Sequence, residues 1–142
     1  MLHFPLIHPD ILAALASAGH GSTVLLADAN YAHSTGTNPA ATLVHLNLRP
    51  GLVTVEQVLA TLVEATPFEA AALMAPDDGS PSPWAERYSE MLGTPVPITL
   101  LARADFKAAC RSTDLALTIA TGDDSHYSNV LLTIGAVPPA HG

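Results

Sequence analysis

GHGSTVLLAD, residues 19–28, joins a histidine between two glycines to a short apolar run that ends in an acid. The apolar part, Thr23–Ala27, has the length of a strand and no polar alternation. That pattern is typical of a strand buried on both faces, as in parallel sheets that are covered by helices. We therefore expect a layered fold of helices and strands around this segment.

The segments on either side of this strand alternate in type. Helical spacing and start signals, among them a capping box of Thr54 and Gln57, predict helices from Pro9 to near Gly19 and over 55–63, 84–92 and 105–111. Short apolar or alternating runs predict further strands over 44–48, 70–74, 98–101, 115–120 and 130–134. The alternation predicts a single α/β domain over residues 1–142, with a largely parallel sheet in an α/β/α arrangement.

The composition is that of a folded chain with few charges. Of 142 residues, 49% are hydrophobic and 13% charged, and a small monomer of this kind would expose much apolar surface. We therefore expect a homo-oligomer. Thirteen acidic residues against five basic ones give a net charge of −8, which excludes the cationic surface that nucleic acids and anionic membranes require. This balance favours a neutral ligand.

Several features of the chain point to the cytoplasm. A single cysteine, Cys110, excludes an intrachain disulfide. The N-terminus lacks the basic and apolar regions of a signal peptide, and no apolar run approaches the ~18 residues of a membrane span.

In parallel sheets, ligands bind beyond the carboxyl ends of the strands. This rule directs attention to Asp28, to Arg103 and to the loop 122–129, each of which follows a predicted strand. Asp28 could accept hydrogen bonds from ligand hydroxyls or orient His20, or it could simply cap the next element. For Arg103, the planar donor fork suits a cluster of sugar oxygens, but a surface arginine near a helix start is an alternative.

Three more residues have suitable chemistry. Imidazole groups exchange protons near neutral pH, so His20 is a candidate acid and base, although glycines around a histidine are also typical of a plain turn. Tyr127 and Asn129 supply directional donors and acceptors, and a phenol ring offers a flat face to a sugar. The alternative for Tyr127 is packing over the sheet edge.

Other classes of site find little support. The seven histidines are scattered and lack the spacing of a zinc hydrolase, although a metal-dependent hydrolase built on them stays a minor alternative. There is no nucleophile elbow, no glycine-rich phosphate loop and no dinucleotide fingerprint. We expect Cys110 to pack inside a helix, and the scattered histidines do not predict a metal site.

Taken together, the motifs resemble those of the RbsD/FucU family from Pro9 to Val137. Residues 19–21, the strand and DANYAHS at 28–34 resemble the family's Gly-His-Gly, strand and Asp-Ala-x-aromatic-x-x-Ser signature. The segment 121–137, with Tyr127-Ser128-Asn129 at its centre, resembles the C-terminal signature. Arg103 falls where the fucose branch carries an arginine and the ribose branch a histidine.

The resemblance implies an RbsD-like fold, ring-shaped homo-oligomers that are commonly decamers, and active sites at subunit boundaries without metal or cofactor. It implies a mutarotase that interconverts the α and β anomers of a free, L-fucose-like monosaccharide. His20 would then be the general acid and base. The substrate would be bound by Asp28, Arg103, Tyr127 and Asn129.

Two related functions stay open. A D-ribose pyranase would interconvert pyranose and furanose rings, and Arg103 counts against it. A non-catalytic sugar-binding or transport-accessory protein would share the site without turnover. The chain departs from the family at Ser22, where an acidic residue is usual, over residues 35–39, and in a spacing about two residues longer between Phe106 and Gly122. These departures concern the identity of the sugar more than the reaction.

Overall fold

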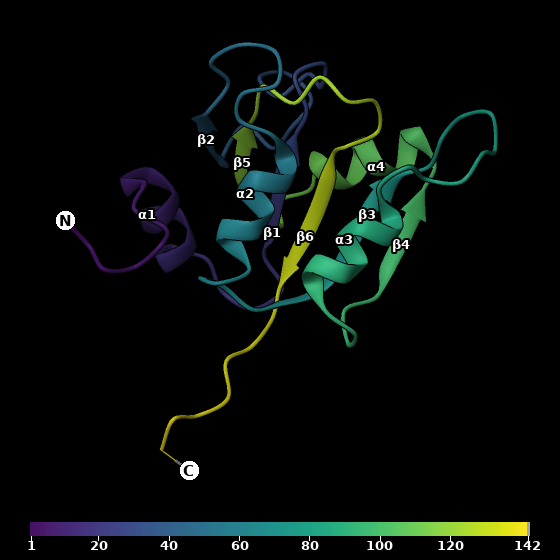
Figure 1. The fold of residues 1–142 in the computed structure, drawn as a ribbon. Coiled ribbons are helices and arrows are strands. Elements are labelled where there is room, and N and C mark those ends of the chain that lie inside the picture. Colours follow the sequence, from purple (N-terminus) through teal and green to yellow (C-terminus); the bar gives the residue numbers. More distant parts are fainter. Residues whose placement is uncertain (142) are drawn as a thin grey trace.

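The computed structural model describes residues 1–141, which form alternating helices and strands as the sequence predicts (Figure 1). The helices are α1 (Pro9–Ser17), α2 (Val55–Leu62), α3 (Ala85–Leu92) and α4 (Arg103–Cys110). The strands are β1 (Thr23–Ala27), β2 (Thr42–His45), β3 (Phe68–Met74), β4 (Ile98–Leu101), β5 (Leu115–Ala120) and β6 (Val130–Ile134). After β6 the chain leaves the body of the molecule (Figure 1).

The strands form one six-stranded sheet in the order β2-β5-β1-β6-β3-β4. The neighbours β2 and β5, β5 and β1, and β3 and β4 pair in parallel, whereas β6 is antiparallel to both β1 and β3. All strands except β6 therefore point the same way, which confirms the predicted largely parallel sheet. The carboxyl ends of the parallel strands and the start of β6 share one edge of the sheet.

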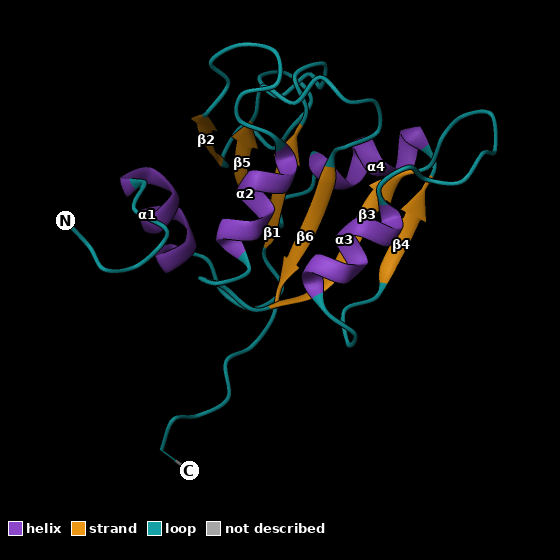
Figure 2. Ribbon diagram, in the orientation of Figure 1, coloured by secondary structure: helices purple, strands orange, loops and turns teal. Residues whose placement is uncertain are grey.

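Helices cover both faces of this sheet (Figure 2), which gives the expected α/β/α layers. On one face, Ile11 of α1, Leu59 of α2 and Tyr88 of α3 belong to the same buried cluster as Leu26 of β1. On the other face, α4 packs Phe106 against a second cluster. Neighbouring residues of β1 point into opposite clusters, because side chains alternate across a strand. This arrangement explains the continuous apolar run Thr23–Ala27.

Several predicted boundaries differ from the structure, among them the start of β3, which is Phe68 and not Ala70, and two of the differences have a clear cause. The strand expected over 44–48 is β2, Thr42–His45, because it pairs with β5 and that partner ends at Ala120, opposite His45. Leu48, predicted within this strand, lies in the following loop and is 80% exposed. The helix expected over 105–111 begins at Arg103, because the chain turns directly from β4 into α4.

The start of α2 is held more firmly than its sequence indicates. The predicted capping box is present, with Thr54 accepting from the Gln57 backbone N–H at 3.1 Å and the Gln57 side chain accepting from the Thr54 N–H at 2.9 Å. In addition, buried Asp123 accepts from the Val55 N–H at 2.9 Å. A carboxylate is favourable at a helix N-terminus. The hydrogen bond from Val55 to Asp123 therefore connects the start of α2 to the loop before β6.

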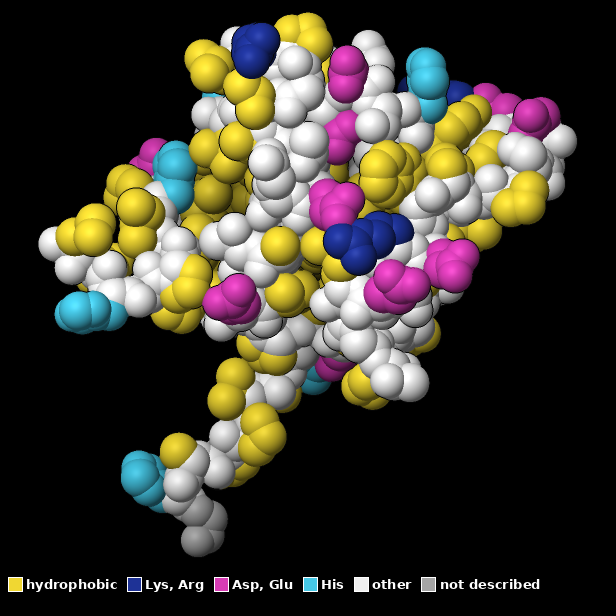
Figure 3. All heavy atoms as spheres, in the orientation of Figure 1, with side chains coloured by type: hydrophobic (Ala, Val, Ile, Leu, Met, Phe, Trp, Pro, Cys, Tyr) yellow, Lys and Arg dark blue, Asp and Glu magenta, His cyan; other side chains and the backbone are white. Residues whose placement is uncertain are grey.

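On the face that Figure 3 shows, acidic side chains are more frequent than basic ones, and apolar side chains are exposed between them. Leu43 on edge strand β2 and Leu100 on edge strand β4 are 37% and 45% exposed. Within residues 1–141, no helix is long and apolar enough to cross a membrane.

Candidate functional site

Four of the five predicted site residues line one cavity of about 250 Å³ at the carboxyl edge of the sheet: Asp28, Arg103, Tyr127 and Asn129. They meet there because β1 and β4 end at this edge while antiparallel β6 begins at it. Drug-sized ligands fill pockets of roughly 300–1,000 Å³. A cavity of this size suits a ligand as small as a monosaccharide.

Asp28 is buried, and both of its carboxylate oxygens accept hydrogen bonds from nearby protein groups. One carboxylate oxygen accepts from the backbone N–H groups of Asn30 and Tyr31, at 2.9 and 2.8 Å. The other accepts from the Asn129 side-chain amide at 3.0 Å, and the Asn129 amide oxygen accepts from the Asp28 N–H at 2.7 Å. These two reciprocal hydrogen bonds fix the orientation of the Asn129 side-chain amide at the cavity.

Burial raises the pKa of the Asp28 carboxyl above its ordinary value, although the hydrogen bonds from Asn30, Tyr31 and Asn129 act in the opposite direction. The charge of nearby Asp123 raises the pKa of Asp28 further. Asp28 is thus a desolvated acid in the cavity wall.

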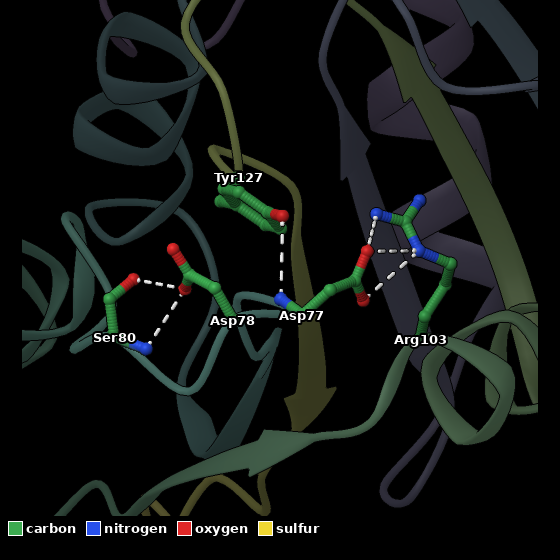
Figure 4. A network of polar contacts seen from close by, with 5 residues as sticks. All are labelled: Asp77, Asp78, Ser80, Arg103 and Tyr127. Carbon is green, nitrogen blue, oxygen red and sulfur yellow. Dashed lines mark hydrogen bonds and ion pairs between the residues drawn. The ribbon is translucent and has the colours of Figure 1, made fainter.

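Arg103, the first residue of α4, is held by an aspartate from the loop after β3. The guanidinium donates from Nη2 to Asp77 Oδ2 at 2.6 Å, and from Nε to both carboxylate oxygens at 3.1 and 3.3 Å (Figure 4). Asp77 lies in the proline-rich loop after β3. The hydrogen bonds from Arg103 lower the pKa of the Asp77 carboxyl below its ordinary value. Arg103 is therefore an oriented donor.

Tyr127 has an unusual backbone conformation. Its φ is +59°, in the left-handed region that residues with a side chain adopt less readily. Its hydroxyl accepts from the Asp77 N–H at 3.5 Å (Figure 4). A tyrosine held in this conformation at a cavity wall is a common sign of a functional position.

His20 lies outside this cavity. It precedes β1, whereas Asp28 follows it, and five strand residues at ~3.3 Å each separate the two by about 17 Å. The prediction that Asp28 orients His20 is therefore wrong within a single chain. The adjoining Gly21 has a φ of +88°, which suits glycine, and its N–H donates to Ile134 at 2.9 Å.

The partner of His20 is Glu69 of β3. His20 Nε2 and Glu69 Oε2 lie 2.8 Å apart, and both side chains are largely exposed, at 58% and 46%. A carboxylate fixes the orientation of an imidazole in this way in many acid–base sites. No sequence signal joins these residues, because they are 49 positions apart.

Sequence reasoning also missed three side chains of the cavity region. Lys107 lines the cavity one helical turn after Arg103, a spacing that places both on the same face of α4. His126 lines it as well, next to Tyr127. Asp77 follows the carboxyl end of β3. The strand-end rule and the helical period could have indicated all three.

The histidines and Cys110, which sequence analysis considered for other kinds of site, can also be located in the structure. Among residues 1–141, no group of three or more His, Cys, Asp or Glu side chains is arranged to hold a metal ion. Cys110 is buried, and burial raises the pKa of its thiol to about 11. It is a packing residue, as predicted.

The chain is similar to proteins of known class. The sequence model of the RbsD / FucU transport protein family matches residues 1–137. The fucose mutarotase of Danio rerio is 28% identical over 146 residues, covering 92% of this chain and 90% of that protein.

Two solved structures resemble the chain over nearly its whole length. The fucose mutarotase from Streptococcus pneumoniae, in complex with L-fucose, has a TM-score of 0.79 and 29% identity, covering 97% of this chain and 100% of that one. Bacillus subtilis RbsD, complexed with D-ribose, has a TM-score of 0.83 and the same coverage. Because RbsD is only 23% identical to this chain, the comparison with RbsD supports the fold alone.

Proposed function

The chain belongs to the RbsD/FucU family, and we propose that it is a mutarotase that interconverts the α and β anomers of a free, L-fucose-like monosaccharide. One observation carries this proposal: Arg103, Tyr127 and Asn129 converge on one small cavity with buried Asp28 behind them. Oriented donors and acceptors of this kind suit a ligand that consists mainly of hydroxyl groups. The likeness to a fucose mutarotase supports the same reaction.

Mutarotation opens and recloses a hemiacetal. The anomeric hydroxyl loses a proton, the bond from C1 to the ring oxygen breaks as the C1 carbonyl forms, and the ring oxygen gains a proton. Rotation about the C1–C2 bond and the reverse steps then give the other anomer. One group that takes and returns a proton serves both directions, and such positioned transfer contributes ~10²–10⁴-fold.

We assign this proton transfer to His20. With its Nε2–H donated to Glu69, the imidazole keeps the lone pair of Nδ1 for the anomeric hydroxyl. Glu69 then stabilises the imidazolium that forms. Arg103 would bind hydroxyls and stabilise negative charge on oxygen as the ring opens. Tyr127 and Asn129 would hold the rest of the sugar.

This assignment requires a second copy of the chain, because His20 and the cavity lie at opposite ends of β1. We propose a homo-oligomer in which His20 of one copy closes the cavity of its neighbour, in a ring that could contain ten copies. Exposed apolar residues on the edge strands, Leu43 and Leu100, support association. We also propose a cytoplasmic location, since a lone buried thiol suits a reducing compartment.

NMR exchange spectroscopy on free sugars tests the function. We expect faster exchange between the α and β anomer signals of L-fucose when the protein is added, and a smaller effect on D-ribose. Faster pyranose–furanose exchange of D-ribose alone would favour a pyranase. Binding of L-fucose without faster exchange of any sugar would contradict the enzymatic proposal and favour a sugar-binding or transport-accessory protein.

A further inference from the structure

The loop after β3 contacts the rim of the cavity through one residue. The Asp77 carboxylate binds Arg103 and its N–H donates to the Tyr127 hydroxyl, so Asp77 joins two residues of the cavity wall (Figure 4). Its neighbour Asp78 points elsewhere, and its carboxylate accepts from the Ser80 backbone and hydroxyl at 2.9 and 2.6 Å. Two adjacent acids of equal charge therefore have different partners.

Asp77 also determines the charge at this rim. The cavity wall contains two cations, Arg103 and Lys107, and one acid, Asp28. With Asp28 ionised, the wall alone has one excess positive charge, and the carboxylate of Asp77 cancels it. A neutral site offers no net attraction to an anion.

We propose that Asp77 is a positioning and specificity residue, which holds Arg103 in one orientation and cancels its charge so that the cavity selects uncharged sugars over acidic or phosphorylated ones. This inference rests on the proposed sugar-binding function. The pair with Asp77 occupies Nε and Nη2 of Arg103, which leaves Nη1 for ligand hydroxyls. Without Asp77, Arg103 and Lys107 become a cationic pair that suits a carboxylate or a phosphate.

Ligand binding can be followed through Trp84, the single tryptophan of the chain. Its indole N–H donates to the backbone oxygen of His126 at 3.1 Å, and His126 lines the cavity. Fluorescence titration therefore reports occupancy without requiring turnover. The ligands are L-fucose, D-galacturonate as a sugar with a carboxylate, and inorganic phosphate.

In Asp77→Asn we expect the affinity for D-galacturonate and for phosphate to rise about fivefold, and the affinity for L-fucose to fall about threefold, on the scale of an exposed ion pair. Changes of opposite sign cannot come from a merely damaged site. Asp78→Asn is the matched control: it removes the same charge from the next residue of the loop, whose carboxylate binds Ser80, and it should change each affinity less than twofold.

A double variant tests whether Asp77 acts through Arg103. Adding Arg103→Gln to Asp77→Asn should abolish the gain in affinity for anions. The proposal is overturned if Asp77→Asn gains no affinity for anions, if Asp78→Asn gains as much, or if all ligands weaken together with a lower melting temperature. Binding of L-fucose without anomer exchange would instead contradict the mutarotase function alone.

Discussion

Asp28 follows β1 directly, where a ligand is expected, yet both of its carboxylate oxygens are already hydrogen-bonded to protein groups. Its carboxylate fixes the turn at Asn30 and Tyr31 and orients the Asn129 amide. We infer that Asp28 acts on a sugar largely through Asn129. The sequence predicted its place in the site, but not this role, because the partners are 101 positions apart.

The raised pKa of Asp28 has a direction that can be tested. The folded protein holds this proton more tightly than the unfolded chain does. The resulting stabilisation is complete below the ordinary pKa of 3.8 and is lost as the pH rises through the higher folded-state pKa. The free energy of unfolding of the wild type, relative to Asp28→Asn, should therefore fall between acidic and neutral pH.

Urea unfolding of both proteins at a series of pH values measures this difference, and comparison with the variant removes the contribution of other groups. If the free energy of unfolding of the wild type relative to Asp28→Asn instead rises with pH, the hydrogen bonds to the charged carboxylate lower its pKa by more than burial raises it.

Replacing His20 with Ala should reduce anomer exchange by at least ~10²-fold, which is the scale of positioned proton transfer. The melting temperature should barely change, because His20 is largely exposed. Glu69→Gln should also slow anomer exchange, by a smaller factor than His20→Ala. NMR exchange and thermal unfolding measure the two effects.

His126→Ala is the matched control, since His126 is the imidazole that lines the cavity within one chain. If His126→Ala is inactive and His20→Ala retains full exchange, His126 and not His20 is the general acid and base.

At the scale of elements, periodicity predicted β1, β4, β5 and β6 at their observed bounds. The errors occurred where tertiary contacts determine the ends. β2 ends at His45 because β5 ends opposite it, and no local pattern in the sequence contains that information. Likewise, α4 begins two residues earlier than predicted because the preceding strand turns directly into it.

The loop between β5 and β6 depends on Gly122. A Cβ at this position would clash with the backbone oxygens of Arg49 and Leu52, while the Gly122 N–H donates to Val53 at 2.9 Å. We expect Gly122→Ala to lower the free energy of unfolding by about 3 kcal/mol, at the upper end of overpacking effects. It should also weaken sugar binding, because Tyr127 and Asn129 follow in the same loop.

Gly19→Ala is the control for stability, because a Cβ there meets no atom within 4 Å. Chemical unfolding of both variants measures the effect. Equal stability of the two variants would mean that the loop 47–53 moves aside without cost.

At the scale of the whole molecule, the α/β/α layers follow from the sequence pattern, since a strand buried on both faces requires helices on both sides. The cavity also follows, because the carboxyl ends of parallel strands share one edge. The separation of His20 from the cavity follows from the same rule, because the predicted strand Thr23–Ala27 already puts His20 before β1 and Asp28 after it. The glycine-flanked histidine and Asp28 lie close in sequence, but β1 places them at opposite ends of the sheet.

The central claim is a mutarotase whose site combines His20 of one copy with the cavity of another. It can be tested by co-expressing His20→Ala with Arg103→Ala, carrying different affinity tags, and measuring the anomer exchange of L-fucose in the doubly purified oligomer. Each variant alone should be nearly inactive. In mixed oligomers, about a quarter of the sites combine an intact His20 with an intact cavity if the copies assemble at random. We predict that about this fraction of wild-type exchange returns; mixed oligomers that stay as inactive as either parent, beside an active wild type, would contradict the shared site.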